Sequence, residues 1–557
     1  MKWLNENSRK FLYKGYLTEG VTPEERIKFI ADKAEEILDM PGFSKKFYGY
    51  MDKGYYSLSS PIWSNFGIRK GLPISCFGGH VVDSMSAILY SQAEAGMMSK
   101  YGGGTSGYFG DVRPRGAVIT DNGHSSGSVH FMQLFDNIVD VVSQGSTRRG
   151  HYAPYLNLDH PDISEFLDIG TEGNSIQNLT HGVTVTDEWM TEMIEGDQEK
   201  RKIWAKVLQR RVEMGYPYIF FTDTVNDNAA DVYKDKNIPI RHSNLCSEIA
   251  LPSNEEWSFV CDLSSMNIFH YEEWKDTDAV ETLVYFLDAV MSDFILKLER
   301  LRDSDDKVDR DGFFFLERSY KFAIENRAIG VGALGWHSYL QSKMIPFESI
   351  AAKKKNVEVF QLIQEKSYEA SRELAKKFGE PKMLKGYGRR NTTLNAVAPT
   401  TSSAFILGQV SQSIEPIWSN AYVKDIDKMK VTIKNKTLEN LLEEKGQNTK
   451  EIWTSIRDHD GSVLHLDFLS DLEKDVFKTF SEIDQYEILD QAASRQQYID
   501  QSQSLNLMIY PEVSAKEINE LYLFAWRNKV KTLYYQHSTN AAQKFSQDKL
   551  CTTACEA

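Results

Sequence analysis

The 557-residue chain has few cysteines and no long apolar run. Five cysteines in a chain of this length are too few for the disulfide framework of a secreted protein. The first residues, Met-Lys-Trp-Leu-Asn-Glu-Asn-Ser, lack the apolar core of a signal peptide. No segment reaches the ~18 uncharged apolar residues of a membrane span, because the nearest one, 283–298, carries Asp288 and Asp293. These absences predict a protein of a reducing cytoplasm (the host cytoplasm if the chain is viral) with no membrane contact.

Basic charge and cofactor motifs are also scarce. The net charge of −15 argues against a nucleic-acid partner, since a phosphate backbone requires clusters of Lys and Arg. Gly330–Gly335 matches G-x-G-x-x-G, but no acidic residue follows at the ~20-residue spacing of a dinucleotide site, so we interpret it as a strand-to-helix junction. No cysteine pair has Cys or His partners at zinc spacing, and we expect no metal site.

The patterns that are present predict an α/β protein. Thr22-Pro-Glu-Glu25 is typical of a capping box with Pro at the first helical position, and apolar residues then recur at helical spacing. Short apolar runs such as 218–221 and 258–261 alternate with amphipathic segments, which favours a parallel sheet with helical crossovers. We expect a helical N-terminal region over 1–70, a main α/β domain over 71–540 and a flexible tail over 541–557.

The cysteines fall into two groups. Cys76, Cys246 and Cys261 are spread through the body of the chain, whereas Cys551 and Cys555 lie within its last seven residues. A thiol pair on a flexible end can carry electrons to a buried pair by disulfide exchange. This division predicts redox chemistry.

Asn244, Cys246 and Glu248 alternate along the chain, so that in extended geometry their side chains face one space. Cys can act there as a nucleophile or radical carrier, Glu as a general base and Asn as an orienting hydrogen-bond donor. The alternative, common for such a pattern in isolation, is a buried structural cysteine beside a solvated carboxylate.

Two further motifs have both a functional and a structural interpretation. Tyr534 and Tyr535 are either packing residues or redox tyrosines. The hydroxyl-rich segment Pro399–Ala404, which leads into an apolar run, suits either a phosphate at a helix N-terminus or simple N-capping.

Taken together, these pieces resemble the large (catalytic) subunit of class I ribonucleotide reductase over about residues 45–557. The resemblance rests on Ser59-Ser-Pro-Ile62, Ile74-Ser-Cys76, Asp83-Ser84, Ser243-Asn-Leu-Cys-Ser-Glu-Ile-Ala-Leu251, Val260-Cys-Asp-Leu-Ser264, Arg390-Asn-Thr-Thr-Leu394, Pro399–Ala404, Ile414-Glu-Pro416, Ile499-Asp-Gln-Ser502 and Val530-Lys-Thr-Leu-Tyr-Tyr-Gln536. It implies a ten-stranded α/β barrel made of two antiparallel five-stranded halves, with a central finger loop that carries Cys246. A short, mainly helical N-terminal region would precede the barrel, and a flexible redox tail would follow it.

The resemblance also implies roles for single residues. Cys246 would form the thiyl radical that removes the 3′ hydrogen of a ribonucleoside diphosphate, Glu248 would act as general base, and Asn244 would bind near the 2′ and 3′ hydroxyls. Cys76 and Cys261 would supply two electrons and end as a disulfide. The tail pair Cys551 and Cys555 would re-reduce that disulfide, and would itself be reduced by thioredoxin or glutaredoxin. Tyr535 and Tyr534 would relay the radical from a separate small subunit, which holds the radical cofactor.

Binding sites follow from the same resemblance. The substrate would contact Ser60, Ser75, Gly104, Asn244, Glu248, Thr400, Thr401, Ser402 and Ser403. A deoxynucleoside triphosphate or ATP effector with its Mg²⁺ would bind near Asp83, Ser84 and Arg113, and the loop 173–179 would connect it to the substrate. A homodimer is expected.

Two departures and two alternatives complete these expectations. Because the sequence opens almost at the family core, we expect no ATP-binding cone and no dATP shut-off through one, with specificity control retained. The core is also shorter than usual.

The first alternative is an adenosylcobalamin-dependent (class II) reductase, which has no need of Tyr534 and Tyr535. The second is a non-catalytic nucleotide-binding paralogue, against which the five cysteines and Glu248 argue.

Overall fold

The computed structural model describes residues 1–69, 71–144, 149–426 and 429–538. Its N-terminal part is helical, as predicted. The helices are α1 (Glu6–Tyr13), α2 (Pro23–Leu38), α3 (Phe43–Lys53) and α4 (Ser60–Asn65), with the short strand β1 (Tyr56–Leu58) between the last two. The predicted capping box of α2 is confirmed, since Thr22 accepts from the backbone of Glu25 and the Glu25 carboxylate accepts from the backbone of Thr22.

Five parallel strands form the first half of a barrel. In sheet order they are β2 (Cys76–His80), β3 (Gly104–Tyr108), β4 (Tyr152–Asn157), β5 (Gly182–Val185) and β6 (Tyr218–Phe221). The connections contain α5 (Met85–Lys100), α6 (Ser128–Val141), α7 (Ile163–Phe166), α8 (Asp187–Glu195) and α9 (Gln198–Met214). Because each strand is followed by a helical crossover, the parallel sheet that the apolar runs predict is confirmed.

The second half contains two regular strands, β7 (Phe259–Asn267) and β8 (Ile329–Leu334), which pair in parallel. It continues through two segments that form single parallel bridges, Val331 with Asn395 and Val397 with Gln503. It ends at β12 (Thr532–Leu533), where the Tyr534 amide donates to the carbonyl of Leu505. The strand-to-helix junction predicted at Gly330–Gly335 is also confirmed, because β8 ends at Leu334 and α16 (Trp336–Ser342) follows.

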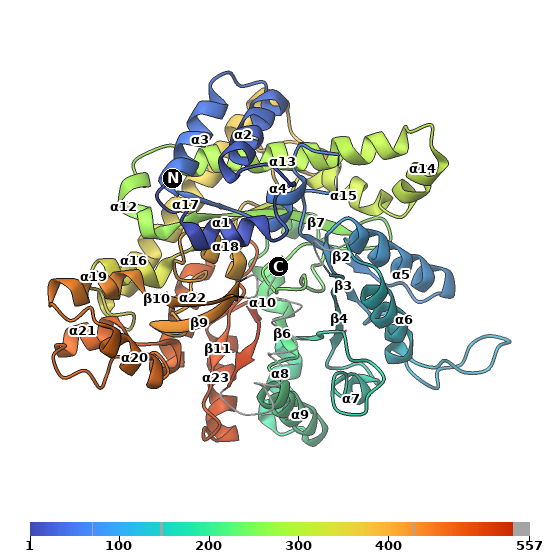
Figure 1. Cartoon of the computed structure of the whole chain (residues 1–557). Helices are drawn as coiled ribbons and strands as arrows, with labels where there is room; N and C mark the ends of the chain where they lie inside the picture. Colours follow the sequence, from blue (N-terminus) through green and yellow to red (C-terminus); the bar gives the residue numbers. More distant parts are fainter. Residues whose placement is uncertain (70, 145–148, 427–428, 539–557) are drawn as a thin grey trace.

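The two halves meet at two antiparallel seams. At one seam β2 pairs with β7, and at the other β6 pairs with β12. The ring of ten segments therefore closes, and the predicted ten-stranded α/β barrel is confirmed. In Figure 1 these strands lie at the centre, with helices around them.

The remaining helices lie mainly in the connections of the second half. They are α10 (Thr222–Asp227), α11 (Asp231–Asp235), α12 (Tyr271–Trp274), α13 (Ala279–Arg302), α14 (Lys307–Phe314), α15 (Glu317–Asn326), α17 (Ile350–Phe378), α18 (Thr401–Ile406), α22 (Gln485–Gln496) and α23 (Ala515–Arg527). The long apolar segment 283–298 lies within α13, which packs against α17 and β7. Short parallel strands β11 (Leu507–Met508) and β13 (Gln536–His537) pair beside the second seam.

A satellite unit follows α18. The hairpin of β9 (Ala421–Ile426) and β10 (Met429–Lys434) precedes α19 (Lys436–Glu444), α20 (Lys450–Asp458) and α21 (Asp471–Val476). These elements share a small apolar core of their own, which includes Leu438, Trp453 and Phe477. This unit lies at the edge of the molecule, at the lower left of Figure 1.

The finger loop, which follows α11 and precedes β7 in the chain, enters the barrel interior. Its base is an antiparallel bridge between Ser243 and Ala250. Tyr155 from β4 donates to the carbonyl of Asn244 at 3.0 Å, and Thr532 from β12 donates to the carbonyl of Ser247 at 2.9 Å. Because these contacts come from strands in both halves of the barrel, they hold the tip of the loop near its axis.

Candidate active site

Cys76 and Cys261 lie directly opposite each other where the two barrel halves meet. The register of the β2–β7 pair places their Cα atoms as partners. Facing residues of an antiparallel pair have Cβ atoms ~4.5–5.5 Å apart, and their Cα separation falls within the range of a disulfide. Cys76 is 7% exposed and Cys261 is fully buried, and neither forms a disulfide. The two cysteines can therefore be joined with little movement of the backbone.

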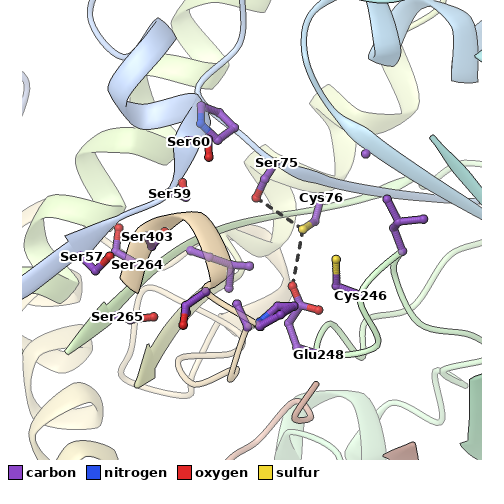
Figure 2. Close-up of a pocket in the computed structure, with 17 residues that line it drawn as sticks. Ser57, Ser59, Ser60, Ser75, Cys76, Cys246, Glu248, Ser264, Ser265 and Ser403 are labelled. Atoms are coloured by element: carbon purple, nitrogen blue, oxygen red, sulfur yellow. Dashed lines mark hydrogen bonds between the residues drawn. The ribbon is translucent and has the colours of Figure 1, made fainter. Parts of the chain in front are cut away.

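The finger loop brings the third cysteine to the same place. Asn244 Nδ2 donates to Cys76 Sγ at 3.3 Å, and Cys76 Sγ contacts Glu248 Oε1 at 3.8 Å. Figure 2 shows Cys76, Cys246 and Glu248 around one cavity.

The alternation of residues 244–248 led us to expect an extended backbone that points these side chains into one space. The side chains do meet, but the backbone is not extended. Residues 245–247 form a turn and a bend, and Ser247 has a left-handed φ of 68°. The tight tip turns Cys246 and Glu248 towards the cavity together. The expected extended backbone is therefore wrong, because a loop that ends inside a barrel has to reverse direction.

Glu248 is a buried carboxyl group at this site. Its side chain is 1% exposed, and burial raises its pKa to about 7, although hydrogen bonds with Asn244, Ser504 and Cys76 oppose the rise. Ser504 Oγ lies 3.1 Å from Glu248 Oε2 and also contacts the carbonyl of Cys246. A carboxyl group with this pKa can take or give a proton near neutral pH.

Cys261 is also buried in a setting that favours its protonated form. Burial, together with the nearby Asp262, raises the pKa of its thiol well above the usual range. Gln501 Nε2 donates to Cys261 Sγ at 3.5 Å. Cys261 is therefore held as a protonated thiol.

The cavity in front of these groups has about 580 Å³ of empty volume and is lined with hydroxyls. Ser60, Ser75, Gly104, Thr400 and Ser403, all expected to contact substrate, are among its lining residues. Three other expected contacts, Asn244, Thr401 and Ser402, do not line it. Thr401 Oγ1 instead lies 3.2 Å from Gln412 Oε1, and Ser402 is buried.

Four further serines, which were not predicted as site residues from the sequence, also line the cavity: Ser57, Ser59, Ser264 and Ser265. Within the described residues, the hydroxyls of Ser59 and Ser264 are buried without a hydrogen-bond partner. Buried polar groups are nearly always paired, so these two fit a polar ligand in the cavity. Position 104 favours glycine for a steric reason, since a Cβ there would lie 3.2 Å from the Leu245 side chain of the finger loop.

Tyr534 lies buried beside Cys246, and Tyr535 next to it is half-buried. Their ring centroids are 4.4 Å apart, and Tyr218 from β6 packs against both, at 4.8 and 5.1 Å. Burial raises the pKa of Tyr534 well above its usual range, and the adjacent Cys246 adds to the rise. The phenol of Tyr534 therefore stays protonated next to the finger-loop cysteine. Tyr218 lies in an apolar run that predicts only a strand, so nothing in the sequence indicates its packing against the two tyrosines.

Comparison with known proteins gives the same assignment over nearly the whole chain. The family description "Ribonucleotide reductase, barrel domain" matches residues 74–200, 195–383 and 380–536, and "Ribonucleotide reductase, all-alpha domain" matches residues 2–71. The chain belongs to the ribonucleotide reductase family.

Individual relatives of the reductase agree. A solved structure described as an Actinobacillus ureae class Id ribonucleotide reductase alpha subunit is 54% identical, covers 98% of each chain and has a TM-score of 0.90. The ribonucleoside-diphosphate reductase large subunit of Invertebrate iridescent virus 3 is 32% identical and covers 93% of this chain and 91% of its own. A Frog virus 3 protein, provisionally named as the same large subunit, is 36% identical and covers 89% of this chain and 88% of its own.

The residues expected to bind an effector lie together at the start of α5 in this reductase. Arg113 Nε donates to Asp83 Oδ2 at 2.7 Å, and the Arg113 amide donates to the other carboxylate oxygen. Ser84 is the N-cap of α5. The loop 173–179 is tied to α6, since the Asn178 amide donates to Asp136 at 2.8 Å.

The remaining expectations concern the tail cysteines, membrane contact and metal binding. Cys551 and Cys555 lie outside the described residues. Within the described part of the chain, no helix has the length and apolar character that a bilayer crossing needs. The same residues contain no cluster of three or more His, Cys, Asp or Glu side chains that could hold a metal ion.

Proposed function

We propose that this chain is the catalytic large subunit of a class I ribonucleoside-diphosphate reductase, which converts ribonucleoside diphosphates to 2′-deoxyribonucleoside diphosphates and so supplies DNA synthesis. One observation carries the proposal. Cys76, Cys246 and a carboxyl group of pKa about 7 line a single serine-lined cavity inside a closed barrel, and Cys261 faces Cys76 across the barrel seam. The names of the viral relatives and the class Id title of the structural neighbour support the reaction and the class.

Hydrogen abstraction is assigned to the finger loop. A thiyl radical on Cys246 takes the 3′ hydrogen of the ribose, and Glu248 takes the proton of the 3′ hydroxyl. Asn244 orients the ribose hydroxyls. The enclosed cavity favours this chemistry, because water and oxygen would otherwise quench a carbon radical.

Reduction is assigned to the seam of the barrel. Cys76 protonates the departing 2′ hydroxyl, and Cys76 with Cys261 then supplies two electrons and forms a disulfide. Their facing register supports this step, as does the raised pKa of Cys261, which keeps its proton available. Cys551 and Cys555 re-reduce the disulfide and are recharged by thioredoxin or glutaredoxin, a proposal that rests on sequence alone.

The radical arrives from a separate small subunit, which holds the radical cofactor, through Tyr535 and Tyr534. The packed aromatic rings that end beside Cys246 support this route over the adenosylcobalamin alternative. No radical cofactor is assigned to this chain itself.

Binding and regulation complete the proposal. The substrate phosphates lie along the hydroxyls of Ser60, Ser75, Thr400 and Ser403, with Thr401 and Ser402 between the last two in the same segment. A deoxynucleoside triphosphate or ATP with Mg²⁺ binds at Asp83, Ser84 and Arg113 and acts through the loop 173–179. The protein works as a cytoplasmic homodimer.

The test is conversion of CDP to dCDP by the purified chain with the small subunit from the same genome, dithiothreitol, and ATP or dATP, beside the Cys246→Ser variant. Turnover in the parent chain and none in the variant would support the thiyl mechanism and the two-subunit arrangement together. Turnover only when adenosylcobalamin replaces the small subunit would contradict the class assignment.

A further inference from the structure

The aromatic path does not end at Tyr535. The imidazole of His537 lies 5.6 Å from the Tyr535 ring, and the indole of Trp418 lies 4.4 Å from that imidazole, centroid to centroid. Burial lowers the pKa of His537 to about 3, so that the intervening ring is neutral. Trp418 is 38% exposed. A continuous row of rings therefore joins the cavity to the protein surface.

The nitrogen of that surface indole faces a buried carboxyl group. Trp418 Nε1 donates to Glu415 Oε2 at 3.3 Å. Glu415 is 4% exposed, and burial raises its pKa to about 7. The other contacts of Glu415 lead back to the path, because Asn506 Nδ2 donates to Glu415 at 3.3 Å and Asn506 Oδ1 accepts from the Tyr535 amide at 3.2 Å.

These features differ from those of an ordinary surface aromatic. Indole and phenol are the aromatic side chains that lose one electron most readily. An indole becomes strongly acidic on losing an electron, so that a proton acceptor at Nε1 stabilises the oxidised state. Trp418 has such an acceptor on one side and an aromatic route to Tyr535 on the other.

We propose that Trp418 is the relay residue at the surface of this chain, through which the electron of Tyr535 leaves for the small subunit, with Glu415 as the proton acceptor of the indole. The inference rests on the proposed function, since it extends the route assigned to Tyr535 and Tyr534.

The electrons and protons balance in two steps. In the first, Trp418 gives one electron to a one-electron oxidant on the small subunit, and its Nε1 proton moves to the Glu415 carboxylate. In the second, an electron from Tyr535 reduces Trp418, which takes its proton back from Glu415. The phenol proton of Tyr535 passes to water at the interface, since Tyr535 is only partly buried. Glu415 ends unchanged.

The competing explanation is that Trp418 only docks the small subunit. Exposed Trp residues often carry binding energy at interfaces. The two roles separate experimentally, because a docking residue acts through affinity and a relay acts through the rate at saturating partner.

The experiment compares Trp418→Phe, Trp418→Tyr and Trp526→Phe, each titrated with the small subunit and assayed for CDP reduction at saturation. Trp526 is a matched control, because its Nε1 also donates to a carboxylate, that of Asp187 at 2.6 Å, but it lies on α23 away from the row of rings. The relay role predicts that Trp418→Phe lowers saturated turnover by about tenfold or more. Trp418→Tyr keeps more activity than Trp418→Phe, and Trp526→Phe stays near the parent.

Small-subunit affinity should change by less than about twofold in all three variants. Rapid-freeze EPR of the parent complex, mixed with substrate and effector, should show a transient tryptophan radical that Trp418→Phe removes. Full saturated turnover in Trp418→Phe, or a loss that increasing small subunit restores, would overturn the relay. Cys246→Ser and Tyr534→Phe run alongside: if either stays active, the proposed function itself fails, whereas their inactivity beside a fully active Trp418→Phe removes only the relay.

Discussion

The two ends of the cavity are built differently. Its inner end consists of Cys76, Cys246 and Glu248, which lie deep in the barrel and contact one another or the finger loop. Its outer end consists of serine hydroxyls, and those of Ser59 and Ser264 are buried without a partner in the described chain. The inner groups thus have partners before substrate binds, whereas the hydroxyls of Ser59 and Ser264 at the outer end lack one in the described chain and can acquire one from a ligand. This difference predicts that inner substitutions act on the chemical step and outer ones on binding.

The largest effect is expected at the tip of the finger loop. Cys246→Ser should abolish CDP reduction, because a hydroxyl cannot replace a thiol as the hydrogen-abstracting radical. Equilibrium binding of CDP should remain within about twofold of the parent, since the outer end is untouched. Measurable turnover in this variant would remove the distinction between the two ends.

Glu248→Gln should lower kcat by roughly 100- to 10,000-fold, the usual contribution of a general base. The parent should lose activity as the pH falls through about 7, because the carboxylate must be unprotonated to accept the 3′-hydroxyl proton and its pKa is about 7. The variant should lack this acidic limb. A pH–rate profile of kcat for both proteins checks the assignment, and an unchanged acidic limb would assign the titration to another group.

At the outer end, Ser59→Ala and Ser264→Ala should raise KM for CDP by roughly 2- to 12-fold with little change in kcat, since each removes one hydrogen bond of ~0.5–1.5 kcal/mol to the ligand. The free energy of unfolding should change by less than about 0.5 kcal/mol, because neither hydroxyl has a partner to lose. Steady-state kinetics and denaturant titration measure both quantities. A fall in kcat at constant KM would contradict a binding role.

The smallest effect is expected from a comparison of two neighbouring serines, which tests which residues belong to the outer end. Ser403 lines the cavity and its neighbour Ser402 does not. Ser403→Ala should raise KM as the other outer variants do, whereas Ser402→Ala should leave it within about twofold. The reverse order would mean that the phosphate contacts follow the sequence motif rather than the cavity wall.

Much of this arrangement could be predicted from sequence, since the motifs around Cys76, Cys246 and Cys261 led to the family and hence to the barrel. The local sequence does not show that Cys76 pairs with Cys261, because the two residues come from strands far apart in the chain and meet only where the barrel halves join. The turn at Ser247 was missed because alternation is a rule for strands, and it does not hold at a loop tip with a left-handed residue.

The outer serines and the surface tryptophan were missed for a different reason. Ser264 is the last residue of a recognised motif within a strand, and nothing in the sequence says which face of that strand meets the cavity. Trp418 lies two residues after the motif Ile414-Glu-Pro416, yet its proposed role depends on its contact with His537, which lies in another part of the chain. Such residues become visible only when the fold places separate segments side by side.

The most direct test of the account is a single turnover by a chain in which both tail cysteines are replaced, Cys551→Ser with Cys555→Ser, with the small subunit, CDP and effector but no dithiothreitol. The account predicts about one dCDP per active site, because two thiols supply two electrons, and an equal amount of a Cys76–Cys261 disulfide by mass spectrometry of non-reduced peptides. Formation of dCDP with Cys76 and Cys261 still free would contradict it.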